Sequence, residues 1–218
     1  ETRYFMNGIY FEKQEENLIM VATDGRRLAC VSKPLCAGVN DFESSIVPPK
    51  VLNIILKRLP SEGNLSIAVV NKMIYFKFGN YSFASVLIDG QFPNYKRVIP
   101  ETQTKHFQIN RKDLLDALRR VGLLVEQKSR RVYFDLSDGM LSITAQESEI
   151  GTAKEEVPCR YAGENITIAL NYLYVEEPMK VIDTEYITFE FSEAMKAITM
   201  RPEPAQDFFH IIMPMQAE

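Results

Sequence analysis

The residues most able to do chemistry in this sequence gather in residues 21–31, where Asp24 and Arg27 flank Gly25. A carboxylate beside a guanidinium in a cleft could act as a general base or hold an anionic group. An Asp-Gly step between alternating apolar residues is also a strong signal for a tight turn, because glycine adopts positive φ without steric cost and aspartate tolerates it. We therefore predict a structural turn here, and an enzyme that uses Asp24 with Arg27 is the alternative.

Two further segments have a similar character, residues 89–100 (Asp-Gly-Gln-Phe-Pro-Asn-Tyr-Lys-Arg-Val-Ile-Pro) and residues 210–215 (His-Ile-Ile-Met-Pro-Met). Together with residues 21–31 they offer a hydroxyl, arginines, prolines and unbranched or aromatic apolar groups. Such a set suits a surface that receives the apolar side chains of a partner. The sequence has no Gly-rich phosphate loop and no Cys/His ligand spacing, and His106 and His210 are too far apart in sequence to suggest a metal site, so we expect no cofactor.

Composition limits the class of protein. The 218 residues, 46% of them hydrophobic, are enough for one large or two ordinary domains. The net charge of −4 argues against strong non-specific attraction to nucleic acid, so any such contact must come from a local basic face. No apolar run approaches the length of a membrane helix, and the odd number of cysteines has no zinc spacing. We therefore predict a cytoplasmic protein without membrane contact.

Apolar periodicity predicts mostly strands in the first half of the chain. The predicted strands are residues 3–11, 18–23, 27–31, 44–47, 65–70, 74–78 and 81–88, and the predicted helix is residues 49–59. Pro49 suits the first turn of that helix, where its missing N–H costs nothing. Lys50 and Lys57 project from one side of it.

After a polar linker the pattern restarts and then repeats. Asn110 and Asn171 precede two predicted helices, the second of which Pro178 should kink or end. The predicted strands are residues 106–109, 132–136, 140–145, 150–157, 166–169, 187–191, 195–200 and 208–213. Such repetition predicts an α+β chain of two tandem domains, residues 1–101 and 102–218, each built from strand-helix-three-strand halves. The first domain is expected to lack its opening strand and helix.

With the repeat established, four motifs in order carry a family resemblance. They are Arg-Tyr-Phe-Met-Asn-Gly at residues 3–8, Ala-Thr-Asp-Gly-Arg-Arg-Leu-Ala at 22–29, Asp-Gly-Gln-Phe-Pro-Asn-Tyr at 89–95, and Ile-Met-Pro-Met at 212–215. In this combination the chain resembles the β sliding clamp of bacterial DNA polymerase III, over most of the second and all of the third domain of a three-domain subunit. The implied fold is the DNA-clamp (processivity) fold.

The resemblance implies a ring in which two full-length subunits join head to tail as a homodimer around duplex DNA. Members of the family are non-catalytic subunits of a DNA-directed DNA polymerase. They receive polymerase, clamp-loader and repair proteins through short linear peptides in a pocket near the junction of the second and third domains. The 218-residue chain is not expected to close into a ring by itself. A protein-interaction module unconnected with DNA is the alternative function.

Matched by motif, the resemblance also implies individual residues. The implied peptide-binding residues are Met6, Thr23, Gly25, Arg26, Arg27, Leu28, Pro93, Arg97, Val98, Asn171, Tyr174, Ile198, Met200, Ile212, Met213, Pro214 and Met215. The implied DNA-facing residues are Arg3, Tyr4, Lys50, Lys57, Arg58, Arg119 and Arg120. The basic helical residues could instead serve only solubility. The family often has histidine at Arg26, an apolar residue near Ser129 and arginine at Gln216, so these positions could alter the preference for partner peptides.

Overall fold

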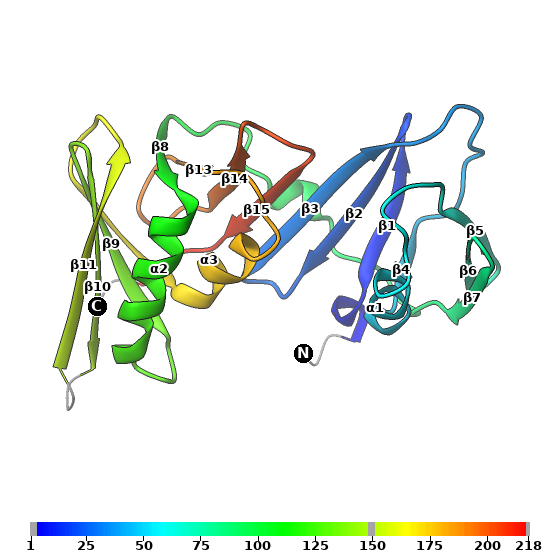
Figure 1. Ribbon diagram of the computed structural model, residues 1–218, viewed down its shortest axis with the longest axis horizontal. Coiled ribbons are helices and arrows are strands. Elements are labelled where there is room, and N and C mark those ends of the chain that lie inside the picture. Colours follow the sequence, from blue (N-terminus) through cyan, green and yellow to red (C-terminus); the bar gives the residue numbers. More distant parts are fainter. Residues whose placement is uncertain (1–3, 148–150, 217–218) are drawn as a thin grey trace. The chain divides into compact units, whose positions relative to one another are not determined.

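The computed structural model describes residues 4–147 and 151–216. The chain divides into two compact units, Glu1–Lys96 and Arg97–Glu218 (Figure 1). The predicted domain boundary after residue 101 lies a few residues beyond this division. No helix in the described parts of the chain is long and apolar enough to cross a membrane.

The first unit contains two antiparallel sheets and one α-helix. Its elements are η1 (Tyr4–Asn7), β1 (Ile9–Gln14), β2 (Asn17–Thr23), β3 (Arg27–Pro34), β4 (Ser45–Val47), α1 (Pro49–Leu56), β5 (Ser66–Val70), β6 (Met73–Phe78), β7 (Tyr81–Val86) and, at the end of the unit, the start of η2 (Tyr95–Val98). One sheet has the order β4-β1-β2-β3 and the other β5-β6-β7. Three strands are thus followed by a strand, a helix and three strands, as the sequence predicts.

Alternation along the strands makes the core of the first unit. In β6, Ile74, Phe76 and Phe78 point inward and are at most 4% exposed. Val51 and Ile55, one helical turn apart on α1, pack in the same cluster as these side chains. Pro49 begins α1 at a position where a backbone N–H would have no partner in the helix.

Two boundaries in the first unit differ from the prediction. The strand predicted over residues 3–11 is wrong for Tyr4–Asn7, which form a 3-10 helix. β1 begins only at Ile9, which pairs with Val47, and the preceding Gly8 packs so closely on Ile46 that a Cβ would clash with it. α1 ends at Leu56, before the predicted residue 59, since the next N–H groups fold back onto the Ile55 carbonyl.

The second unit repeats one arrangement twice. Its elements are β8 (Lys105–Asn110), α2 (Arg111–Val121), η3 (Gly122–Leu124), β9 (Arg131–Ser137), β10 (Met140–Glu147) and β11 (Gly151–Arg160), then β12 (Ile166–Asn171), α3 (Tyr172–Met179), β13 (Tyr186–Phe191), β14 (Ile198–Glu203) and β15 (Phe208–Ile212). Within the unit the strands follow the order β12-β9-β10-β11-β8-β13-β14-β15. The predicted strand-helix-three-strand halves are confirmed.

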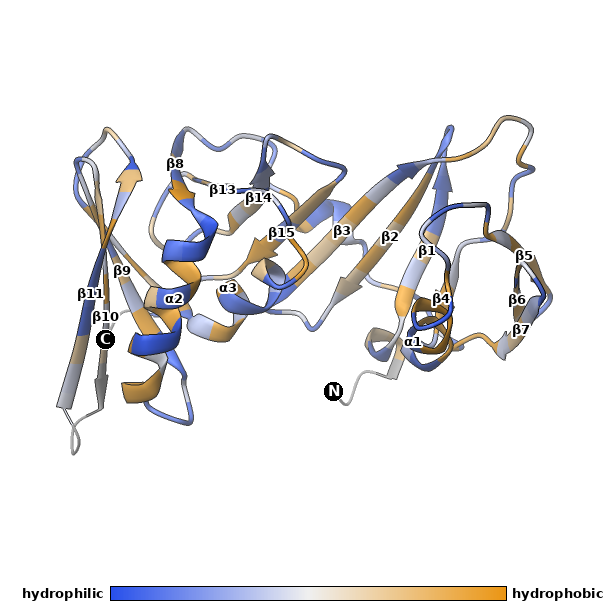
Figure 2. Ribbon diagram, viewed as in Figure 1, coloured by the Kyte–Doolittle hydropathy of each residue, from blue (hydrophilic) through white to orange (hydrophobic). Residues whose placement is uncertain are grey.

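α2 supplies the centre of the second core. Asn110 caps it by accepting hydrogen bonds from the backbone N–H groups of Lys112 and Asp113. Its inward side chains, among them Leu114 and Leu118, have no exposed surface. Hydrophobic and hydrophilic residues alternate along this helix in Figure 2. This is the pattern of a helix with one face on a core and the other in solvent.

α3 is the shorter helix and lies against α2 (Figure 1). Asn171 caps it through the N–H of Leu173, and Pro178 lies just before its last residue, as the predicted ending requires. The strand predicted over residues 195–200 is displaced, since β14 runs from Ile198 to Glu203 in register with β13.

Candidate functional site

The Asp24 turn is a closed hydrogen-bonded loop. The Asp24 Oδ1 atom accepts the backbone N–H groups of Arg26 and Arg27, each at 3.0 Å, and its Oδ2 atom accepts Arg27 Nε at 3.0 Å. The Thr23 hydroxyl donates to the Arg27 carbonyl at 2.7 Å and accepts the Gly25 N–H at 3.1 Å. Gly25 has a φ of 83°, which glycine adopts without strain. The turn prediction is confirmed.

This geometry makes Asp24 a poor general base. Partial burial acts to raise its pKa, but the hydrogen bonds from Arg26 and Arg27, with the charge of Arg27, hold that pKa below its ordinary value. A general base works best with a pKa near the working pH. The observed contacts therefore favour the structural role of Asp24 over the enzyme alternative.

Residues 89–98 are anchored by aromatic side chains. Phe92 stacks on Tyr10 with ring centroids 4.8 Å apart, and the Tyr95 hydroxyl donates to Glu12 at 2.9 Å. Burial, followed by the hydrogen bond to Glu12, raises the pKa of Tyr95. The implied site residue Pro93 lies exposed between these anchors. Tyr10 and Glu12 are supporting residues that sequence reasoning missed, because they lie about 80 positions away on β1.

The second unit gathers several of the implied peptide-binding residues near the first turn of α3. The N–H of Met215 donates to the Ala169 carbonyl at 2.8 Å, which ties the end of the chain to β12 just before Asn171. Tyr174, Pro214 and Met215 are partly exposed, and Met213 is 42% exposed. The backbone pairing of Met215 with Ala169 thus brings the apolar residues 213–215 close to the start of α3.

Other residues of the implied set lie beneath the surface. Ile198 pairs with Ile212 across β14 and β15, and both belong with Met200 to the second core, at most 1% exposed. In the first unit, Met6 and Leu28 are 8% and 3% exposed. These side chains support a surface, whereas Arg26, Arg97 and the 49%-exposed Val98 are available to solvent.

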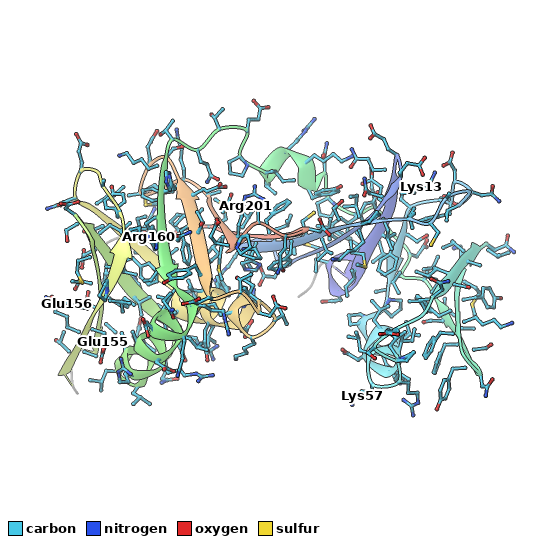
Figure 3. All side chains as sticks on the ribbon, turned by 45° about the horizontal axis from the view of Figure 1, so that its top comes forward. Lys13, Lys57, Glu155, Glu156, Arg160 and Arg201 are labelled. Carbon is cyan, nitrogen blue, oxygen red and sulfur yellow. The ribbon has the colours of Figure 1, made fainter. Side chains whose placement is uncertain are left out.

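Lys50 on α1 and Lys57 and Arg58 directly after it are the basic residues of this region. Lys50 and Lys57 are exposed, and within the described residues neither forms an ion pair (Figure 3 labels Lys57, which extends away from α1). Arg58 donates to the carbonyl of Ile54 at 3.3 Å. Tyr4 begins η1, and Arg3 lies outside the described residues.

Arg119 and Arg120, near the end of α2, form ion pairs with carboxylates instead. Arg120 holds Glu155 of β11 in a bidentate contact with distances of 2.8 and 2.9 Å. Arg119 lies 3.5 Å from Glu176 of α3, which also approaches Lys180. The hydrogen bond with Arg120 lowers the pKa of Glu155, so this partner stays ionised at neutral pH. The sequence did not reveal that these two carboxylates pair with the arginines, because they come from elements distant in the chain.

Comparison with known proteins assigns both units to one family. A family model described as DNA polymerase III beta subunit, central domain, matches residues 1–94, and one described as its C-terminal domain matches residues 96–216. The chain is 48% identical over 221 residues to the beta sliding clamp of Treponema pallidum, covering 100% of this chain and 60% of that protein. It is 31% identical to the beta sliding clamp of Escherichia coli, covering 99% of this chain and 59% of that protein.

Solved structures agree with this assignment. A DNA polymerase sliding clamp from Pseudomonas aeruginosa, solved with a ligand, matches with a TM-score of 0.94 at 32% identity, covering 100% of this chain and 60% of that one. A Bartonella birtlesii sliding clamp bound to griselimycin matches with a TM-score of 0.93 at 30% identity, again over 100% and 60%. The chain thus spans about 60% of the length of these relatives. It belongs to the DNA polymerase III beta subunit family, the family of the beta sliding clamps.

Proposed function

We propose that this chain forms part of a non-catalytic sliding clamp that encircles duplex DNA and tethers the replicative polymerase. Clamp-loader and repair proteins dock on it through short linear peptides. The full-length protein acts in the cytoplasm as a head-to-tail homodimer, and the chain by itself does not close into a ring. Support comes from family membership over both units and from relatives named beta sliding clamp.

The observation that carries the peptide-binding proposal is the exposed apolar end of the second unit. Met213 and Met215 flank Pro214 next to the capped start of α3, where Asn171 and Tyr174 lie. Methionine is unbranched and repacks around different side chains, which suits a site with many guests. Ile198, Met200 and Ile212 lie in the core beneath and keep this surface rigid.

Three arginines are the charged polar groups of the proposed peptide-binding residues. Arg26, exposed beside the closed Asp24 turn, offers a cation for peptide carbonyls or carboxylates. Arg27 is held by Asp24, and with Thr23 and Gly25 it fixes the turn rather than moving with each guest. Arg97 adds a second exposed cation at the start of the second unit.

The test is a titration of this chain with a fluorescent peptide that contains Gln, Leu and a terminal Leu-Phe pair. Met213→Asp is expected to weaken binding by about thirtyfold, because the peptide would cover an unpaired charge at a central contact. Val181→Asp is the matched control, since Val181 is 76% exposed and follows the other end of α3. Equal affinity of the Met213→Asp variant and the unmodified chain would contradict the assignment.

A further inference from the structure

A separate hollow opens in the second unit where β8 and β11 move apart. These strands pair only at Ile109 with Cys159 and at Gln108 with Arg160. Beyond this point the two segments line an open hollow of about 430 Å³, a volume within the range of small-ligand sites. The lining residues are Thr104, Lys105, His106, Arg160, Tyr161, Ala162 and Gly163. None of them belongs to the candidate peptide-binding or DNA-facing residues.

The side chains around this hollow have uncompensated basic character. Within the described residues, no carboxylate forms an ion pair with Lys105, His106 or Arg160. Glu190 stands opposite His106 in the β13 register, but Arg201 Nε binds its carboxylate at 2.9 Å. In a chain with net charge −4, two cations without an ion pair among the described residues, Lys105 and Arg160, line one hollow, which favours an anionic ligand there.

The principal cation is held in place before any ligand arrives. Arg160 Nη1 donates to Gln108 Oε1 at 2.7 Å, and its guanidinium lies 5.3 Å from the ring centroid of Tyr186 (Figure 3 labels Arg160). The remaining N–H groups of its planar fork match the geometry of a phosphate or carboxylate. An arginine fixed in this way loses little side-chain entropy on binding.

Tyr161 and Gly163 form another part of the lining, and this part is also held in place. Tyr161 is buried, and its hydroxyl donates to the Glu164 carbonyl at 2.7 Å, which closes the loop after β11. Gly163 lies against this ring, since a Cβ there would come within 2.7 Å of the Tyr161 hydroxyl oxygen. Packed groups therefore shape this part of the hollow.

We propose that this hollow binds a small phosphate-class oxyanion. Arg160 contacts two of its oxygens, Lys105 supplies a second charge, and a ring N–H of His106 donates a further hydrogen bond. The site does not depend on the proposed clamp function, because no peptide-binding or DNA-facing residue takes part in it.

The experiment is a titration of isotope-labelled 218-residue chain with inorganic phosphate at constant ionic strength and pH, followed by amide NMR. Saturable shifts confined to residues 104–106 and 160–163 are expected. Arg160→Gln should weaken binding at least about tenfold, since hydrogen bonds to charged groups contribute on this scale. Lys105→Gln should weaken it less, and Lys112→Gln on α2 should leave it unchanged.

Three results would overturn the proposal. One is the same affinity in the Arg160→Gln variant, and another is shifts spread over basic residues throughout the surface. The third is that acetate binds as tightly as phosphate, which would show that the hollow does not prefer phosphate. Arg160→Lys keeps the charge and is expected to retain part of the affinity, so a folding defect in Arg160→Gln is distinguishable from loss of the site.

Discussion

The basic side chains at α1 and those near the end of α2 are in different electrostatic states. On α1 and directly after it, Lys50 and Lys57 have no ion-pair partner among the described residues. On α2, Arg119 and Arg120 face carboxylates from α3 and β11. The difference shows that a count of cations on a helix does not measure its attraction for DNA. We therefore expect α1 to contribute most to phosphate contact in the proposed clamp.

Two leucines, one on each helix, differ strongly in burial. Leu118 of α2 is 0% exposed, whereas Leu56 of α1 is 68% exposed. Leu118→Ala is expected to lower the free energy of unfolding by about 3 kcal/mol, because it leaves a cavity in the core. Leu56→Ala should change it by less than about 0.5 kcal/mol. Urea unfolding followed through NMR signals of each unit measures both, and equal losses would contradict this difference in burial between the two leucines.

DNA binding tests the electrostatic part of the comparison. The double change Lys50→Gln and Lys57→Gln is expected to weaken binding of duplex DNA roughly tenfold at low salt. It should also lower the slope of log affinity against log salt by about 2, since each phosphate contact contributes about 0.9. The double change Arg119→Gln and Arg120→Gln is the matched control and should have the smaller effect. Fluorescence anisotropy with a labelled duplex measures the DNA affinity of both double variants. A larger loss of affinity in the Arg119/Arg120 variant would contradict the expectation that α1 contributes more.

The two helices also begin differently. Asn110 caps α2 through two backbone N–H groups, whereas Pro48 before α1 makes no side-chain cap. Asn110→Ala should cost about 1 kcal/mol of unfolding free energy, and Asn110→Asp should restore most of it because aspartate also caps. Thermal unfolding of the unmodified chain and of the two Asn110 variants measures these differences. A fully stable Asn110→Ala variant would mean that packing alone holds the start of α2.

Removing the carboxylate partner of Arg120 should leave this arginine without an ion pair, like the lysines of α1 and the turn after it. Glu155→Gln removes the charged partner of Arg120, so DNA affinity at low salt is expected to rise by a few-fold at most, as exposed ion pairs are weak. The hydrogen bond with Arg120 lowers the pKa of Glu155, so this carboxylate is protonated, and the pair lost, at a lower pH than for an unpaired glutamate. Unchanged affinity in the same anisotropy assay would indicate that Arg120 faces away from DNA.

Most of the architecture follows from local patterns. Period-two alternation and the Asn110 and Asn171 caps predict both halves of the second unit. The strand prediction is wrong for Tyr4–Asn7, and the close packing of Gly8 on Ile46, directly before β1, is a long-range contact that the local pattern does not reveal. A sequence pattern records apolar character but not the three-dimensional neighbours that decide such boundaries.

The candidate site was less predictable than the fold. Ile198 and Ile212 are as apolar in sequence as the exposed Met213, yet they are core residues. Alternation identifies which strand residues point the same way, but it does not say whether a partner or the protein's own core covers them. The pairing of Arg120 with Glu155 could not be predicted from the sequence either, since 35 residues separate the two in the chain.

The measurement that tests the central proposal most directly is retention on DNA by the protein completed to the full length of its relatives and placed by a clamp loader on closed circular duplex. If the protein encircles DNA, it stays on the circle in high salt and is released when both strands of the circle are cut, because the free ends let the ring slide off. Equal retention on the closed and the cut DNA would contradict encirclement and indicate ordinary surface binding.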